Sequence, residues 1–228
     1  MPITIYSGLP GAGKSLVMAD QILYILHRNF KWWKKSGIQR VVWSNLKLLP
    51  KYEERYKGFL KYWDEPVQLT PLRDVDIFWD EVATHMDNLN YQNTPLELKR
   101  WLQQHRKFGI EIYGNTQDFA MVDIAFRRMT SELFILRKLI GSPDRSNTKP
   151  PVKYIWGIIL IRQMNPQDYK EDTKENKAYG FDIFLINRER IEVFDTSQEI
   201  KMGKYPPLKH FERTCEISDC NFKRVLHT

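Results

Sequence analysis

The sequence predicts an α/β fold in which helices flank a central, mostly parallel sheet, with a β-hairpin or meander extension towards the carboxyl end. A β-prone run, Ile3 to Ser7, leads through a glycine-rich loop into residues 15–29, where apolar residues recur at helical spacing. Strand-like and helix-like segments then alternate up to residue 117, the order that builds right-handed βαβ units. After residue 130 strand-like runs follow one another with few helices between them, which predicts the extension. These runs are 132–141, 153–164 and 179–196.

Three further strands of the central sheet are predicted from short apolar runs. They cover residues 40–46, 74–81 and 110–117. In the run at 74–81, the residues Ile77, Phe78 and Trp79 are continuously apolar before Asp80 and Glu81, as expected for a strand buried on both faces of a parallel sheet. Between the first two runs, a polar stretch rich in Tyr and Lys predicts one short helix before about residue 70.

Residues 94–108 predict a helix with recognisable start and stop signals. Thr94 is a candidate cap, Pro95 then occupies the first helical position, and Glu97 follows the cap by three residues. Gly109 is expected to end this helix, because glycine adopts the left-handed conformation found after helix ends.

The composition is that of a folded, water-soluble chain. Of the 228 residues, 42% are hydrophobic and 28% charged, which argues against a largely disordered protein. The longest apolar stretches, such as Tyr154 to Ile161, fall short of the roughly 18 residues of a membrane-spanning helix. No secretory signal begins the chain, and two cysteines are too few for a disulfide framework, so a cytoplasmic location is expected.

Positive charge is concentrated in one segment. The formal net charge is +7, which suits an anionic partner such as nucleic acid or an acidic membrane surface. In residues 27–40, "HRNFKWWKKSGIQR", cations alternate with three aromatic residues that could stack on bases. The alternative is a solvated helix end whose aromatic residues pack inwards.

The stretch "GLPGAGKS" fits the phosphate-loop pattern G-x-x-x-x-G-K-[ST] and stands between a predicted strand and a predicted helix. Its glycines let backbone N–H groups surround a polyphosphate, and the helix dipole adds to the attraction. Lys14 would reach the β and γ phosphate oxygens, and Ser15 would bind Mg²⁺. A chance glycine-rich turn is the alternative. The predicted nucleotide-binding residues are Gly8, Leu9, Pro10, Gly11, Ala12, Gly13, Lys14 and Ser15.

Two consecutive acidic residues end the predicted strand at 74–81. Asp80 would hold Mg²⁺ together with Ser15, and Glu81 could polarise the attacking water in ATP hydrolysis. Two carboxylates at the end of a buried strand are costly unless they serve a metal ion, although a solvated turn pair is the alternative.

The strand at 110–117 ends in polar residues that could sense the γ phosphate. Gln117 is the preferred candidate and Asn115 the alternative. A further possibility is that both are polar residues that only form the turn after the strand. A cation that stabilises the transition state is often needed as well, sometimes from a neighbouring subunit. The candidates are Arg106, Arg127 and Arg128. For each of them, the alternative is an ordinary surface position or a structural ion pair.

The carboxyl-terminal stretch holds four residues, two His and two Cys, of types that can bind zinc. They are His210, Cys215, Cys220 and His227. Their spacing is loose for a zinc site, which favours plain thiols over metal ligands.

Several motifs in this order resemble the Zot-like proteins, named for zonular occludens toxin, which include the assembly ATPases of filamentous phages. They are "GLPGAGKS", "SNL", "IFWDE", "QQHRKFG", "IEIYGNTQ", "VDIAFRRMTSELFILRKLIG" and "VFDT". The resemblance spans about residues 1–197 and implies a RecA-like P-loop ATPase domain related to the FtsK and HerA group of ring-forming DNA pumps, with residues 198–228 as a tail. It implies ATP and Mg²⁺ as ligands, Lys14 and Ser15 in the phosphate loop, Asp80 and Glu81 as the acidic pair, and Gln117 as the sensor.

One departure from the family changes the expected role. Filamentous-phage members place a membrane helix after the ATPase domain, and the sequence given has none. The expected function is therefore a ring-forming ATPase that moves DNA during genome packaging or export, with a virion or membrane-associated protein as a further partner. A nucleotide-gated scaffold that moves no DNA is the first alternative. A small-molecule kinase is the second, disfavoured because strands follow the predicted sensor where a kinase usually has an Arg-rich lid.

Overall fold

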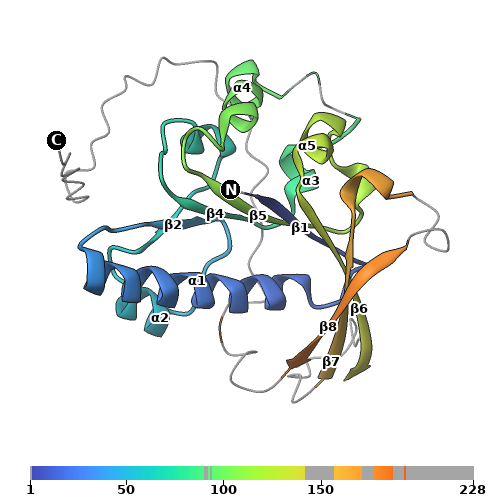
Figure 1. Cartoon of the computed structure of the whole chain (residues 1–228), viewed down its shortest axis with the longest axis horizontal. Helices are drawn as coiled ribbons and strands as arrows, with labels where there is room; N and C mark the ends of the chain where they lie inside the picture. The colour runs from blue at the N-terminus through green and yellow to red at the C-terminus, as the bar shows by residue number, and fades with distance from the viewer. Residues whose placement is uncertain are drawn as a thin grey trace.

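The computed structural model describes residues 2–89, 92, 94–141, 157–170, 177–186 and 193. They form one eight-stranded sheet in the order β3-β2-β4-β5-β1-β6-β7-β8, with helices on both faces (Figure 1). The strands are β1 (Ile3–Ser7), β2 (Val42–Ser44), β3 (Leu60–Tyr62), β4 (Asp76–Trp79), β5 (Glu111–Thr116), β6 (Glu132–Gly141), β7 (Gly157–Met164) and β8 (Ala178–Ile186). The helices are α1 (Lys14–Ser36), α2 (Pro50–Arg55), α3 (Val82–His85), α4 (Leu96–Gln104) and α5 (Ile124–Met129), with short 3-10 turns η1 (Pro66–Leu69), η3 (Phe119–Met121) and η4 (Pro166–Asp168).

The strands from β3 to β6 in this order are all parallel, and β7 and β8 are antiparallel to their neighbours. The carboxyl ends of the parallel strands therefore meet at one edge of the sheet, which we call the carboxyl edge. Ser7 at the end of β1 lies between Thr116 of β5 and Ile135 of β6. The residues that follow β1, β4 and β5 in the chain therefore lie close together at the carboxyl edge.

Alternate residues of the central strands build a core on each face. In β4, Ile77 and Trp79 pack with α4 and α5 on one face, while Phe78 packs with α1 and α2 on the other. Both groups are fully buried, as the continuous apolar run predicted. Among the described residues, no helix combines the length and the apolar character needed to span a membrane.

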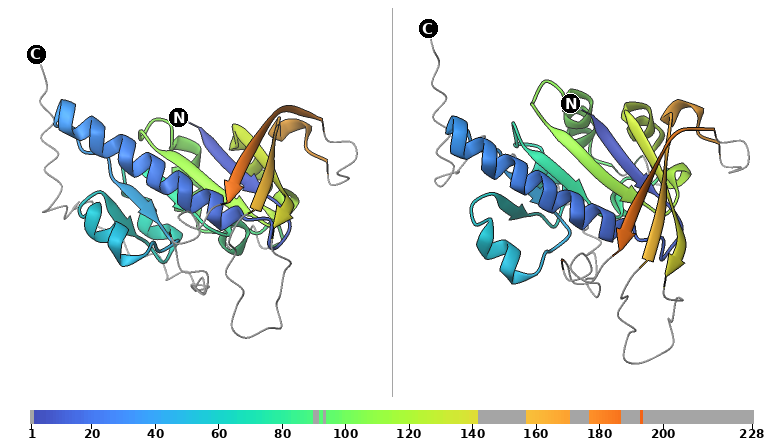
Figure 2. Two further views of the ribbon diagram at one scale, coloured as in Figure 1. Left: turned by 90° about the horizontal axis from the view of Figure 1, so that it is seen from below. Right: turned by 60° about the horizontal axis from the view of Figure 1, so that its bottom comes forward.

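Helix α1 is longer than its apolar spacing suggested and runs along the whole sheet (Figure 2). Met18, Ile22 and Leu26 recur at helical spacing and are fully buried against the sheet. Gly37, with φ 72°, ends the helix and donates its backbone N–H to the Trp33 carbonyl at 2.8 Å. The basic, aromatic segment is thus the exposed last part of the same helix that starts at the phosphate loop.

The region between β2 and β4 contains more structure than predicted. In place of one short helix it forms α2, strand β3 and the turn η1. Three residues are too few for a recognisable period, so the sequence pattern alone did not identify β3. Its pairing with β2 makes it the edge strand of the sheet.

Helix α4 is shorter than the predicted helix at both ends. Its cap position is Pro95, without a side-chain capping bond, so the predicted Thr94 cap was wrong. The first helical hydrogen bond runs from Lys99 N–H to the Pro95 carbonyl, one residue later than expected, and Thr94 is buried. Short helix α5 was also not predicted, because it offers fewer than two turns of periodic sequence.

The "HRKFG" stretch is a tight turn from α4 into β5. Ile110 N–H bonds to the His105 carbonyl at 3.0 Å. Helix α4 ends at Gln104, so the prediction that Gly109 ends this helix was wrong, although Gly109 does adopt a left-handed φ of 71°. A Cβ at Gly109 would collide with the carboxylate of Asp74. The guanidinium of Arg73 lies 3.6 Å from the centroid of the Phe108 ring. The residues of the "HRKFG" motif are therefore explained by packing of this turn, in which Gly109 lies against Asp74 and Phe108 lies against Arg73.

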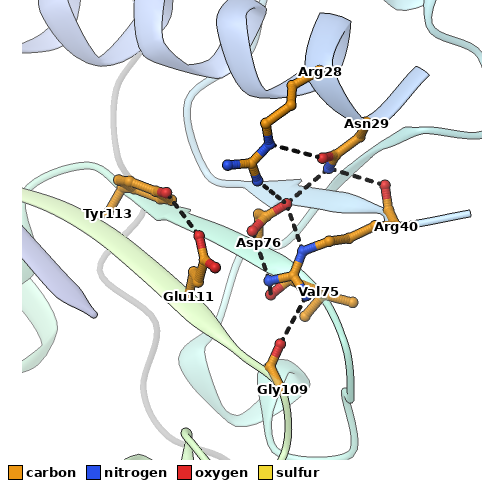
Figure 3. A network of polar contacts seen from close by, with 8 residues as sticks. All are labelled: Arg28, Asn29, Arg40, Val75, Asp76, Gly109, Glu111 and Tyr113. Carbon is orange, nitrogen blue, oxygen red and sulfur yellow. Dashed lines mark hydrogen bonds and ion pairs between the residues drawn. The ribbon is translucent and has the colours of Figure 1, made fainter. Parts of the chain in front are cut away.

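A buried ion-pair network ties α1 to the amino-terminal edge of the sheet (Figure 3). The Asp76 carboxylate is fully buried and accepts hydrogen bonds from Arg40 at 2.7 and 2.9 Å and from Asn29 at 2.8 Å. Arg40 also donates to the carbonyls of Val75 and Gly109 at 3.0 Å each. The network satisfies a buried charge and joins three segments distant in sequence.

Strands β6 to β8 form the predicted extension, but β6 is also part of the parallel sheet. It pairs with β1 through residues 132–135, so β1 is an interior strand, and β7 and β8 complete an antiparallel meander (Figure 1). Leu136, Ile159 and Phe184 of these strands pack against Ala12 and Val17 beside the phosphate loop. Residues 187–192, 194–196 and the predicted domain boundary at 197/198 lie outside the described residues.

Candidate functional site

The phosphate loop links the end of β1 to the start of α1 at the carboxyl edge. Gly8 N–H bonds to the Thr116 carbonyl at 3.3 Å, and Ala12 N–H bonds to the Leu9 carbonyl at 3.0 Å, which fixes the loop against β5 and closes a turn. Helix α1 has no acidic residue in its first turn, so its amino end keeps the positive potential that attracts phosphate.

The extension supports the phosphate loop from behind. A Cβ at Gly8 would come within 2.6 Å of the Leu136 carbonyl oxygen, and one at Gly13 would meet the side chain of Ile159. Gly13 also has φ 90°, which other residues rarely adopt. Glycine is therefore required at both positions, because β6 and β7 pack directly against the loop.

The Lys14 side chain lies along the inside of the loop. Its Nζ donates to the carbonyl of Gly8 at 2.9 Å and of Leu9 at 3.4 Å. Burial lowers the pKa of Lys14, and the carboxylates of Glu81 and Asp80 partly offset this effect. The ammonium group is thus held between the loop and the two acidic residues, where a triphosphate would lie.

Asp80 lies one residue beyond β4, and its carboxylate is buried beside Ser15. Ser15 Oγ donates to Asp80 Oδ1 at 3.3 Å, and the Asn115 side chain donates to the same oxygen. Burial raises the pKa of Asp80, while the hydrogen bonds from Asn115 and Ser15 and the charge of Lys14 lower it. A hydroxyl and a carboxylate side by side fit Mg²⁺, which takes one or two protein oxygens and keeps several waters.

Glu81 adopts an unusual backbone conformation at the start of α3. Its φ of 53° and ψ of 62° place it in the left-handed region, which costs a non-glycine residue roughly 1–3 kcal/mol. Burial raises the pKa of its carboxyl group, and the charge of Lys14 and a hydrogen bond from Gln117 lower it. The structure therefore brings Glu81, Gln117 and Lys14 close together.

Asn115 and Gln117 occupy different positions. Asn115 is fully buried, and its side chain binds the backbone N–H of Glu81 at 2.8 Å as well as Asp80. Gln117 is exposed directly after β5 and contacts the Glu81 carboxylate. The geometry favours Gln117 over Asn115 as the residue that could contact a γ phosphate or a water.

Sequence reasoning missed the role of Asn45. It lies directly after β2, where its side chain donates to the Asp80 carbonyl at 2.9 Å and accepts from the Asp80 N–H at 2.6 Å. The only sequence signal was the position of "SNL" at a strand end, next to the strand that carries Asp80. Asn45 and Asn115 together hold the backbone of both acidic residues.

The candidate arginines lie away from this cluster within the chain. Arg106 is exposed in the turn before β5, at the edge of the sheet opposite the carboxyl edge, and donates to Ser131 at 3.3 Å. Arg127 and Arg128 are in the last turn of α5, which leads back towards the start of β6. Within this chain Arg106 therefore lies at the edge of the sheet that does not carry the phosphate loop.

The four candidate zinc ligands, His210, Cys215, Cys220 and His227, lie outside the described residues. Within the described ranges, no group of three or more His, Cys, Asp or Glu residues is arranged to hold a metal ion.

Comparison of sequences finds no matching family model and no matching curated protein. Comparison of structures finds the N-terminal domain of zonular occludens toxin from Neisseria meningitidis, with a TM-score of 0.53 and 18% identity over 85% of this chain and 98% of that chain. The genome packaging NTPase B204 of Sulfolobus turreted icosahedral virus 2, in complex with ATP-gammaS, has a TM-score of 0.45 and 10% identity over 80% and 96% of the two chains. The flagellar accessory protein FlaH of Methanocaldococcus jannaschii has a TM-score of 0.44 and 12% identity over 80% and 84%.

The likeness to the zonular occludens toxin domain concerns the fold. Together with the strand order and the phosphate loop between β1 and α1, it shows that this chain has the RecA-like P-loop NTPase fold.

Proposed function

We propose that this chain is a Mg²⁺-dependent ATPase that forms a homo-oligomeric ring and moves DNA during phage assembly, by packaging the genome into a capsid or exporting it. One observation supports the ATPase activity above all. The phosphate-loop residues Lys14 and Ser15 and the carboxylates of Asp80 and Glu81 converge at the carboxyl edge of the sheet.

In binding, the backbone N–H groups of the loop and the amino end of α1 would surround the phosphates. Lys14 would exchange its bonds to the Gly8 and Leu9 carbonyls for bonds to phosphate oxygens. Ser15 and Asp80 would hold Mg²⁺, which when bound neutralises charge on the phosphates. Asn115 and Ser15 keep the buried Asp80 carboxylate oriented for this role.

In hydrolysis, the Glu81 carboxylate would accept a proton from the attacking water, and Gln117 beside it would orient that water. Asn115 holds the Glu81 backbone in place, which fixes the point from which the carboxylate would reach the water. Arg106 or Arg127 of a neighbouring subunit would stabilise charge on the transferred phosphoryl group.

DNA as the cargo is supported by the motif resemblance to Zot-like proteins, by the matching fold and by the net charge of +7. We place the ring in the host cytoplasm, bound peripherally to a capsid vertex or to a membrane-associated protein. Loss of γ phosphate at a subunit interface would then move one subunit against the next.

The test is ATP hydrolysis by the purified chain with and without single-stranded and double-stranded DNA, with the particle sized in the same buffer. Stimulation by DNA in an oligomer is expected. Slow turnover by a monomer that does not respond to DNA would instead favour a nucleotide-gated scaffold.

Two variants with matched controls isolate the site. Lys14→Ala is expected to lose ATP affinity, whereas Lys107→Ala on the exposed turn keeps it. Glu81→Gln is expected to bind ATP but lose about 10² to 10⁴ in rate, whereas exposed Glu97→Gln does not. Full turnover by Glu81→Gln would refute the proposed chemistry.

A further inference from the structure

Almost all of the net positive charge comes from one segment. Residues 27–61 hold ten Lys or Arg residues and two Glu residues, a formal charge of +8, while the whole chain carries +7. The remainder of the chain is therefore close to neutral. The segment comprises the last part of α1, together with β2, α2 and β3, and we call it the basic end.

The basic end lies at one side of the molecule. β3 is the edge strand of the sheet, opposite in strand order to the β6–β8 extension that supports the phosphate loop. Figures 1 and 2 show α1 running from the phosphate loop beside this extension to its far end beside β2 and α2. Lys31, Lys34 and Lys35 at the end of α1 are thus separated from the phosphate loop by the length of this helix, whereas Asn45 in the same segment contacts Asp80.

Most cations of the basic end face solvent. Lys31, Lys34 and Lys35 are exposed, and in the described part of the chain no carboxylate lies within ion-pair distance of them. Lys31 and Lys35 are one helical turn apart and therefore share a face of α1. By contrast, Arg40 is used in the buried network with Asp76.

Aromatic rings accompany these cations. Trp32 is 58% exposed and Trp33 is 40% exposed, although large aromatic residues normally bury their rings. Trp33 still packs edge-on against Phe59 at 5.5 Å, and Lys34 lies 4.6 Å from the centroid of the Phe30 ring. Favourable interaction of lysines with the helix carboxyl end would explain Lys34 and Lys35, but it does not explain an exposed Trp32.

We propose that the basic end is the surface that binds nucleic acid, with Lys31 and Lys35 contacting phosphates and Trp32 stacking on a base or packing on the sugar-phosphate backbone. Cations of the basic end lie on α1, in the loop after β2, on α2 and on β3. This distribution suits a polyanion that crosses the edge of the sheet. A membrane surface would need a continuous apolar face that inserts, whereas here each exposed ring is flanked by cations. Contacts with phosphates and stacking on any base do not depend on the base sequence of the nucleic acid.

This role deepens the proposed function and rests on it, because α1 connects the two sites. The helix has 23 residues and begins at Lys14, so at about 1.5 Å per residue it spans about 34 Å from the phosphate loop to Ser36. Shifts of packed helices and rotations of whole subunits are known ways in which a small change at one site reaches a distant one. By such a movement, a change of nucleotide state at Lys14 would displace the Trp32 end and any DNA bound there.

The experiment measures binding of fluorescently labelled single-stranded and double-stranded DNA without nucleotide, as a function of salt concentration. Lys31→Gln/Lys35→Gln is compared with Arg100→Gln/Lys107→Gln, which removes the same charge from exposed positions near α4. We expect the first variant to bind at least tenfold more weakly and to lower the magnitude of the log–log salt slope by about 1.4 for single strands or 1.8 for duplex. Trp32→Ala should weaken binding without changing this slope.

Equal slopes for Lys31→Gln/Lys35→Gln and wild type would overturn the assignment of this surface, while stimulation of ATPase activity by DNA would keep the proposed function. Equal losses in both double variants would mean that only total charge matters and would also overturn it. Absence of DNA binding by wild type would refute both the surface and the DNA-moving role. A further arm uses vesicles with anionic lipid; loss of vesicle binding in Lys31→Gln/Lys35→Gln with unchanged DNA binding would assign the surface to a membrane instead.

Discussion

The side-chain oxygen of Asn115 accepts a hydrogen bond from the backbone N–H of Glu81 at 2.8 Å, while its amide group donates to the Asp80 carboxylate. Asn115 is fully buried in β5, and Glu81 has a left-handed backbone conformation two residues beyond the end of β4. One residue of a neighbouring strand therefore positions both acidic groups. Asn115 is a positioning residue, because its own side chain is enclosed.

Replacing Asn115 by Ala is expected to reduce the turnover rate about 10-fold to 100-fold, the usual effect of losing a group that orients a site from behind. ATP affinity measured without Mg²⁺ should change little, because Asn115 contacts Asp80 and Glu81 and no residue of the phosphate loop. Measured kcat and KM separate the two effects. Exposed Asn88→Ala serves as the control, and an unchanged kcat in Asn115→Ala would contradict the positioning role.

The arginine assignment predicts complementation between subunits. Arg106→Ala and Lys14→Ala are each expected to abolish turnover alone. A mixture should recover activity, because some interfaces then combine an intact phosphate loop with an intact arginine. Arg127→Ala mixed in the same way tests the second candidate. Absence of recovery for both arginines would mean that neither acts across an interface.

His85 predicts a pH-dependent stability. It ends α3, its ring is buried, and its Nδ1 accepts a hydrogen bond from the Trp79 indole N–H at 3.2 Å, which requires the neutral ring. Burial lowers the pKa of His85 to about 4, below its ordinary value of 6.5. Between these two values the unfolded chain binds the extra proton, so the free energy of unfolding falls as the pH falls, by about 1.4 kcal/mol per pH unit.

Urea unfolding at pH values from 7 to 5 measures this effect. His85→Gln should flatten the dependence on pH relative to wild type, whereas His27→Gln, at an exposed position, should leave it unchanged. Equal slopes in all three proteins would show that His85 does not titrate differently in the folded state.

Asp76→Asn is expected to destabilise the fold by about 3–5 kcal/mol, because it leaves Arg40 without its buried partner. Arg28 contacts the same carboxylate at 3.6 Å, but its side chain is 43% exposed, so Arg28→Gln should cost about 0–1 kcal/mol. The free energy of unfolding in denaturant gives both values. Similar costs for the two variants would mean that solvent screens the Arg40 pair as well.

Local sequence was sufficient for the parts of the site that lie within one strand-loop-helix unit. The phosphate loop from Gly8 to Ser15 was predictable because its glycines, lysine and serine are adjacent in the chain, between a strand and a helix. The meeting of Asp80, Glu81 and Gln117 at one edge of the sheet was predictable, because the carboxyl ends of parallel strands lie at the same edge whatever the strand order. The basic character of residues 27–40 was likewise visible in the sequence.

Tertiary structure alone decided which side chains meet. The sequence did not indicate that β6 pairs with β1, that Asn45 and Asn115 hold Asp80 and Glu81, or that β3 completes the basic end. Nor did it indicate the left-handed backbone of Glu81. Periodicity and motifs report on neighbours along the chain, whereas strand order and hydrogen bonds between strands arise from packing of segments far apart in sequence. The chemistry of the residues was therefore encoded locally, and their positions were set by long-range contacts.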